Sequence, residues 1–300
     1  MPIIISVGSG KGGVGKSILS TNIAYLLAKS GRSVTLIDMD LGGADIHVLM
    51  GLFKPKYTLT DFIENKVDTL DEIAERLNGF ARVRIISGTG DSLHTANMPV
   101  ATRAKLIRHV KLIKSDIVII DVGAGTHVNT LDFFNAANIH LCVTTGDPTA
   151  ILDLYRFIKL AVIRRALSSF LAHDIVSKII RRKDIKNIEE LLAIAAEYGE
   201  DKKQAINNSI NQFYPCIIFN QVNQMPNTQF SRFQSLLQTY LKISKPALLG
   251  KIPEDQELRK SVKVYHPVSS LAPNAPSAKA LKSICDNLLE HIHQFQLGQA

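Results

Sequence analysis

The chain has 300 residues, of which 46% are apolar and 21% charged, a composition typical of a soluble globular protein and unlike that of a disordered or fibrous one. Its three cysteines lie far apart and form no C-x-x-C pair, which argues against a disulfide framework and against a dedicated zinc or iron–sulfur site. The net charge of +8 leaves DNA or an anionic membrane open as a partner, although scattered surface lysines would give the same total.

Short apolar runs alternate with segments of helical spacing along most of the chain. This alternation predicts an α/β fold with a doubly wound, mostly parallel sheet flanked by helices. The predicted strands are 3–7, 34–37, 83–86, 117–120, 139–143, 216–219 and 247–252. The first of them starts almost at the amino terminus without a signal peptide, and no apolar run is long enough for a membrane helix, so we expect a cytoplasmic protein.

The strand pattern lapses over residues 163–213, where the spacing is helical and the charge changes from basic to acidic. We expect a helical insertion within a single domain of residues 1–300. The insertion is either a surface for a specific partner or a simple decoration of the fold, because loops tolerate insertions at low cost.

The first predicted strand is followed by a glycine-rich loop that matches G-x-x-x-x-G-K-[ST] and leads into a predicted helix. Glycines allow the backbone N–H groups to point at phosphates, and the helix presents its positive end to them. Lys16 is expected to reach the β- and γ-phosphates, and the Ser17 hydroxyl to bind Mg²⁺. The predicted phosphate-binding residues are Gly10, Lys11, Gly12, Gly13, Val14, Gly15, Lys16 and Ser17.

Two further strands end in aspartates. Asp38 and Asp40 come at the end of the second predicted strand, where open α/β sheets place their ligands. Asp121 ends a strongly apolar strand and is followed by Gly123-Ala124-Gly125, the Walker B arrangement, in which the carboxylate holds Mg²⁺. Each pattern is weak alone and strong beside the glycine-rich loop.

Lys11, directly after Gly10, resembles the signature lysine of the MinD/ParA family of deviant Walker A ATPases. Three further stretches are similar to the FlhG/FleN and MinD branch of this family. They are Asp38-Met39-Asp40-Leu41-Gly42-Gly43-Ala44-Asp45, Asp121-Val122-Gly123-Ala124-Gly125 and Asp147-Pro148-Thr149. The resemblance covers most of the chain outside the insertion. Ile18 and Val122 depart from the family's usual small polar residues at their positions.

The resemblance implies an ATPase whose two subunits sandwich two ATP molecules, each Lys11 crossing to the partner's phosphates. Asp40 would position the hydrolytic water, and Asp38 would lie near the metal held by Ser17 and Asp121. The adenine contacts would come from Asn220 and from Pro253, Glu254 and Asp255, and no guanine-reading N-K-x-D element is present, so ATP is expected over GTP.

The function implied by this branch is a nucleotide switch, stimulated by a protein partner, that positions or regulates an assembly such as flagella or the division site. A ParA-like partition ATPase that binds DNA nonspecifically is the alternative, because the net charge allows it. A metal-cluster carrier of the Mrp type is disfavoured by the missing cysteine pair.

The carboxyl-terminal segment has one apolar face at helical spacing. In MinD a short amphipathic tail after the last core helix binds membrane, but this chain has no lysine or arginine after Lys282, and an interfacial helix normally carries a basic face. We therefore expect core packing, with membrane association weak or absent and at most peripheral, at the inner face of the membrane. The apolar positions are Ala278, Leu281, Ile284, Leu288, Ile292 and Phe295.

Overall fold

A computed structural model describes the chain except for residues 41–42, 89–97, 169–184, 186, 224–226 and 299–300. Its strands are β1 (Ile3–Gly8), β2 (Val34–Met39), β3 (Glu75–Arg76), β4 (Val83–Ile86), β5 (Ile117–Val122), β6 (Ile139–Thr144), β7 (Pro215–Phe219) and β8 (Ala247–Lys251). Each of the seven predicted strands is present, within two residues of its predicted ends. β3 was not predicted, since two polar residues carry no strand pattern.

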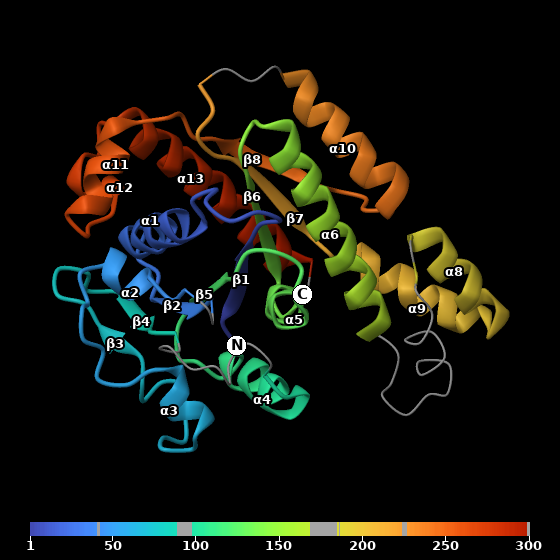
Figure 1. Cartoon of the computed structure of the whole chain (residues 1–300), viewed down its shortest axis with the longest axis horizontal. Coiled ribbons are helices and arrows are strands. Elements are labelled where there is room, and N and C mark those ends of the chain that lie inside the picture. Colours follow the sequence, from blue (N-terminus) through green and yellow to red (C-terminus); the bar gives the residue numbers. More distant parts are fainter. Residues whose placement is uncertain (41–42, 89–97, 169–184, 186, 224–226, 299–300) are drawn as a thin grey trace.

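Within the described residues the strands form one eight-stranded sheet in the order β3-β4-β2-β5-β1-β6-β7-β8 (Figure 1). Every pair is parallel except β3 with β4. The prediction of a doubly wound, mostly parallel sheet is confirmed. β5 lies between β1 and β2, so the second strand of the sequence is near the first without pairing with it.

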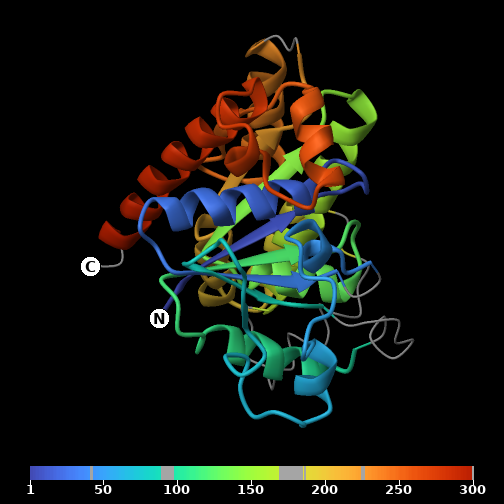
Figure 2. The same cartoon turned by 90° about the vertical axis from the view of Figure 1, so that its left-hand side faces the viewer.

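Helices cover both faces of this sheet. They are α1 (Lys16–Lys29), α2 (Ile46–Leu49), α3 (Leu59–Ile63), α4 (Val100–Val110), α5 (Val128–Asn135), α6 (Pro148–Ser168), α8 (Ile188–Glu197), α9 (Glu200–Asn211), α10 (Asn227–Leu241), α11 (Gln256–Lys263), α12 (Val268–Leu271) and α13 (Pro276–Leu297). Figure 2 shows α1 (blue) and α13 (red) on one side of the sheet and α3 and α4 (cyan and teal) on the other. The helices α1, α12 and α13 bury one apolar core, and α4, α5, α6 and α10 bury the second.

Most of the described part of the predicted insertion is helical. α6 extends to Ser168, and α8 and α9 pack against each other and, through α9, against α6. Much of the rest of the insertion, residues 169–184 and 186, lies outside the described part of the chain. Asp132 on α5 joins α4 to α6, because its carboxylate forms an ion pair with Arg103 and accepts hydrogen bonds from Arg164.

The last helix, α13, turns its apolar face to the sheet, as expected. Leu281, Ile284 and Leu288 are almost completely buried, and Asn287 donates a hydrogen bond to the carbonyl of Leu249 in β8. In the part of the chain that the structure describes, no helix is both long and apolar enough to cross a membrane.

Candidate nucleotide-binding site

The glycine-rich loop joins the carboxyl end of β1 to the amino end of α1. Gly15, directly before α1, has φ of 89°, and Gly13 has φ of 77°, in the left-handed region that glycine adopts most easily. A Cβ on Gly15 would overlap Nδ2 of Asn220, and one on Gly10 would overlap the carbonyl oxygen of Asp153 in α6. The two outer glycines of the motif are therefore required by close packing as well as by the path of the backbone.

The amino end of α1 is arranged to receive an anion. α1 has no acidic residue in its first turn, so nothing on the helix neutralises the partial positive charge of its free N–H groups. Lys16, its first residue, is only 8% exposed. A buried ammonium group beside a helix amino terminus favours a phosphate ligand, which would compensate both charges.

Lys11 has different surroundings from Lys16, although both belong to one loop. Lys11 is exposed, and its backbone carbonyl accepts a hydrogen bond from the Ser9 hydroxyl at 2.7 Å. The carbonyl of Ser9 in turn accepts from the backbone N–H of Gly125 at 3.2 Å, which ties the loop to the glycines after β5. The loop is thus held in place through its backbone while the Lys11 side chain faces outward.

Asp38 and Asp121 lie side by side at the carboxyl edge of the sheet. They are opposite each other in the register of β2 and β5, and the alternation of side chains puts both on the face covered by α1. Both are buried, with exposures of 0% and 1%. The Ser20 hydroxyl of α1 donates to Oδ1 of Asp121 at 2.9 Å. Asp38 accepts from the backbone N–H groups of Asp40 and Ile46, both at 3.1 Å.

Burial dominates the electrostatics of this pair. It raises the pKa of Asp121 to about 6, although hydrogen bonds with Ser17 and Ser20 and the charge of Lys16 act to lower it. Burial and the neighbouring Asp121 carboxylate raise the pKa of Asp38 well above its usual value. Two buried carboxylates next to a serine hydroxyl form an oxygen-donor set that suits Mg²⁺, and a divalent cation would remove the cost of their burial.

Asp40 and Asp45 complete the acidic side of the site. Asp40 lies against the turn after β5, because a Cβ on Gly123 would come within 3.1 Å of its Oδ1. Desolvation raises the pKa of Asp45, a hydrogen bond with Ser17 lowers it, and the Asp40 carboxylate raises it further. Asp45 was not predicted as a site residue, since an aspartate before a short helix looks like a cap, and neither was Ser20, whose hydroxyl has no sequence pattern of its own.

The structure brings Asn220 to the loop but gives its side chain protein partners. Nδ2 of Asn220 donates to the carbonyl of Val14 at 2.8 Å, and Oδ1 accepts from the backbone N–H of Gln221. Asn220 therefore braces the loop, and its contact with adenine stays a prediction. The segments that follow β7 and β8 are joined by a hydrogen bond, in which the backbone N–H of Val222 donates to the carbonyl of Ile252 at 2.9 Å.

The other predicted adenine residues lie beside this junction. Glu254 is exposed, and its backbone N–H donates to Oδ1 of Asn223 at 3.1 Å. Asp255 caps α11 through the N–H of Glu257 and also accepts from Ser277 at the start of α13. The Asp255 carboxylate thus has a structural task. Pro253 lies between Glu254 and the strand end, and the roles of all three toward a nucleotide stay predictions.

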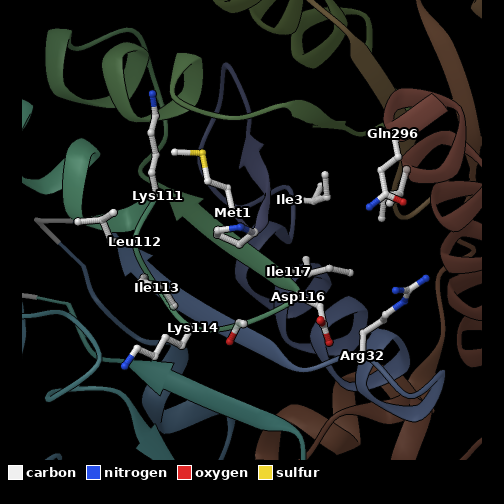
Figure 3. Close-up of a pocket in the computed structure, with 13 residues that line it drawn as sticks. Met1, Ile3, Arg32, Lys111, Leu112, Ile113, Lys114, Asp116, Ile117 and Gln296 are labelled. Carbon is white, nitrogen blue, oxygen red and sulfur yellow. The ribbon is translucent and has the colours of Figure 1, made fainter. Parts of the chain in front are cut away.

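A large cavity of about 550 Å³ lies elsewhere, at the amino ends of the strands. Ile3, Asp116, Ile117 and Gln296 are among the side chains that line it (Figure 3). Parallel strands bring their carboxyl ends to the opposite edge, where the glycine-rich loop lies. A smaller cavity of about 290 Å³ does adjoin the loop, between Gly10, Gly125 and Asp153.

Comparisons with known proteins show which family the chain resembles. A family model for ParA, described as the NUBPL iron-transfer P-loop NTPase, matches residues 1–166. The antiactivator FleN of Pseudomonas aeruginosa is 40% identical over 159 residues, 52% of this chain and 55% of FleN, so the chain spans about half of that relative. An uncharacterized ATP-binding protein of Methanocaldococcus jannaschii is 27% identical over 299 residues, 99% of this chain and 91% of its own length.

A solved structure extends the likeness to the whole fold. The septum site-determining protein MinD of Pyrococcus horikoshii, complexed with Mg-ADP, superposes with a TM-score of 0.67 at 20% identity over 96% of each chain. The region that the family model matches includes the glycine-rich loop and both aspartate-bearing strands. The predicted resemblance is confirmed, and the chain belongs to the ParA family of P-loop NTPases.

Proposed function

We propose that this protein is an ATP-hydrolysing switch that dimerises on binding ATP and, as a dimer, positions or regulates another assembly. The observation that carries the proposal is the contrast between the two lysines of the loop. Lys16 is buried beside the site carboxylates, where it serves its own subunit's nucleotide. Lys11 is exposed at the rim, where it is free to cross to the phosphates of a second subunit.

The residues divide the proposed reaction between them. The backbone of residues 10–16 and the Lys16 ammonium group bind and orient the phosphates, and the buried setting strengthens these contacts. Ser17, Asp38 and Asp121 would hold Mg²⁺, which supplies charge neutralisation at the phosphates when bound. Asp40 lies beside Gly123 and would orient the attacking water. Asn220, Pro253, Glu254 and Asp255 would surround the adenine.

The kind of assembly is inferred from the relatives. FleN is named as an antiactivator and MinD as a septum site-determining protein. Both names describe an action on another target, beyond the binding of a nucleotide. We infer the same class of role here, in the cytoplasm, for a single ATPase domain with the insertion of residues 163–213 inside it. An iron-transfer role has less support, because the three cysteines are buried and lie in separate elements, β6, β7 and α13.

Sedimentation of three proteins with ATP and Mg²⁺ tests this proposal. Asp40→Ala removes a group that acts mainly in the transition state, so it should bind ATP, hydrolyse it slowly and accumulate as a dimer. Lys11→Ala should bind ATP with near wild-type affinity yet remain monomeric, since the phosphates that face the interface lose their compensating charge. An Asp40→Ala protein that stays monomeric at saturating ATP contradicts the switch.

Lys16→Ala is the matched control within the same loop. It should lose most of its ATP affinity in calorimetry while keeping the wild-type circular dichroism spectrum, because the residue contacts the nucleotide of its own subunit. Undiminished ATP binding by this variant would remove the basis of the site itself, and this outcome is distinct from a failure of dimerisation.

A further inference from the structure

A notch of about 300 Å³ opens between the segment that follows α2 and the connection from α11 to α12. Phe53 and Tyr265 meet edge to face there, with ring centroids 4.8 Å apart and planes at 88°, and Phe80 packs against His266 at 5.0 Å. Phe53 is 58% exposed, Val264 55% and Tyr265 42%. We call this feature the Phe53–Tyr265 notch.

Two features of the notch point to recognition rather than to simple packing. Three large apolar side chains are exposed at one place, and exposed apolar clusters of this kind mark interaction sites. Tyr265 also has φ of 57°, a left-handed conformation that is costly for a bulky side chain and that collects at functional sites. The strained turn keeps the Tyr265 ring at the rim, against Phe53.

Cations border the notch. Arg76 lines it, and the exposed Lys54 and Lys263 directly adjoin Phe53 and Val264 in the chain. Glu75 adjoins Arg76 in the same way, so three cations stand against one carboxylate. None of the described residues that line the notch is acidic. The surroundings therefore favour a ligand that combines an apolar group with negative charge.

The geometry favours a peptide over a nucleic acid. Base stacking needs an open aromatic face, but the edge-to-face contact between Phe53 and Tyr265 uses the face of one ring to receive the edge of the other. The concave shape, with Phe80 and Leu77 buried in its wall, suits an inserted side chain.

The geometry points to a docking site for an acidic protein segment that inserts an apolar side chain at the Phe53–Tyr265 notch. The notch is also connected to the nucleotide site. Asp38 accepts from the N–H of Ile46 at the start of α2, and the N–H of Leu52, next to Phe53, donates to the carbonyl of His47 at 2.8 Å. Changes at the phosphates should thus alter affinity at the notch, a regulation that rests on the proposed ATP switch.

The probe is a random library of short displayed peptides, selected on the wild-type protein with ATP and without any selection against Phe53→Ser. Enriched peptides should carry aspartate or glutamate around one large apolar residue. In fluorescence anisotropy their affinity should fall at least about tenfold with Phe53→Ser and with Lys263→Glu. Leu236→Ser, which removes a similarly exposed apolar side chain on α10, is the matched control and should bind normally.

Four results would overturn the docking site. Enriched peptides that are basic, or that bind Phe53→Ser as well as wild type, contradict it. Single-stranded DNA that competes for the notch in a Phe53-dependent manner would make it a nucleic-acid site. Loss of the ATP-dependent dimer in Phe53→Ser, with ATP binding intact, would assign the notch to a second copy of the chain.

A last comparison separates the docking site from the switch. The affinity of an enriched peptide for Asp40→Ala with ATP should differ at least about fivefold from its affinity for wild type with ADP. Equal affinities would contradict the regulation by ATP but not the docking site. Failure of Asp40→Ala to dimerise would contradict the proposed function but not peptide binding at the notch.

Discussion

The pair formed by Asp38 and Asp121 shows how a functional site costs stability. Each carboxylate is buried on the α1 face of the sheet, and each has a raised pKa because the charged form is poorly solvated there. Asp45 adds a third carboxylate with a raised pKa near Ser17. Such a cluster is disfavoured in the protein alone and becomes favourable when a cation is bound.

Asp121→Asn should therefore stabilise the nucleotide-free protein at pH 7. The native state keeps a proton on Asp121 up to pH about 6, while the unfolded chain loses it near 3.8, so stability falls as the pH rises between these values. Removing the group should raise the free energy of unfolding by up to roughly 3 kcal/mol in urea titrations at pH 7. In calorimetry, Mg²⁺ should no longer increase the ATP affinity of the variant.

Asp116→Asn, just before the start of β5, is a control of opposite sign. Hydrogen bonds from the backbone and side chain of Ser33 lower the pKa of Asp116, so its charged form stabilises the fold and its removal should destabilise the protein at pH 7. If both variants shift stability in the same direction, burial is not the dominant effect at Asp121.

At the scale of elements, the junction of β1 and α1 depends on the space beside Gly15. Its left-handed backbone and its contact with Asn220 each exclude a larger residue. Gly31, after α1, has φ of 95°, but a Cβ added to it would meet no atom within 4 Å. A substitution at Gly31 therefore reports only the strain of the left-handed backbone.

Gly15→Ala should cost more stability than Gly31→Ala. The backbone strain is worth about 1 kcal/mol at either position, and the overlap with Asn220 adds to it only at Gly15. Placing Gly15→Ala in an Asn220→Ala background should remove the excess, which a double-mutant cycle in urea measures as a coupling energy. Additive effects would show that Asn220 does not crowd a side chain at position 15.

At the scale of the whole molecule, the core contains a histidine that reports on global folding. His140 in β6 is completely buried and lies in a ring cluster with Phe134 and Phe213, its centroid 4.3 Å from that of Phe213. Burial, with a contribution from the Arg165 charge, lowers the pKa of His140 to about 3. The native state therefore excludes a proton that the unfolded chain accepts.

Above pH 6.5, His140 should not reduce the free energy of unfolding, because it is neutral in both the native and the unfolded state. Below pH 6.5 the free energy of unfolding should decrease, since the unfolded state binds a proton that the native state excludes. The expected slope from this residue is about 1.4 kcal/mol per pH unit between 6.5 and 3. His140→Leu, of similar volume, should reduce the slope of the unfolding free energy against pH over this range. Equal slopes for wild type and His140→Leu would mean that the core admits the proton.

The sequence by itself determined the fold class, seven of the strands and the glycine-rich loop. These features depend on local physics: apolar runs of strand length, helical spacing, and glycines followed by lysine and serine at the start of a helix. The expectation that α13 packs on the core was also local, because its apolar face and its lack of basic residues could be read directly.

Only the tertiary structure decided the strand order and the neighbours of the site residues. The position of β5 between β1 and β2 places Asp38 opposite Asp121, and this order depends on long-range pairing that no local pattern encodes. For the same reason the contacts of Ser20 with Asp121 and of Asn220 with Val14 could not be predicted, since each joins segments far apart in the chain. The Phe53–Tyr265 notch is likewise formed by distant turns, which become one surface only when the sheet and helices bring them together.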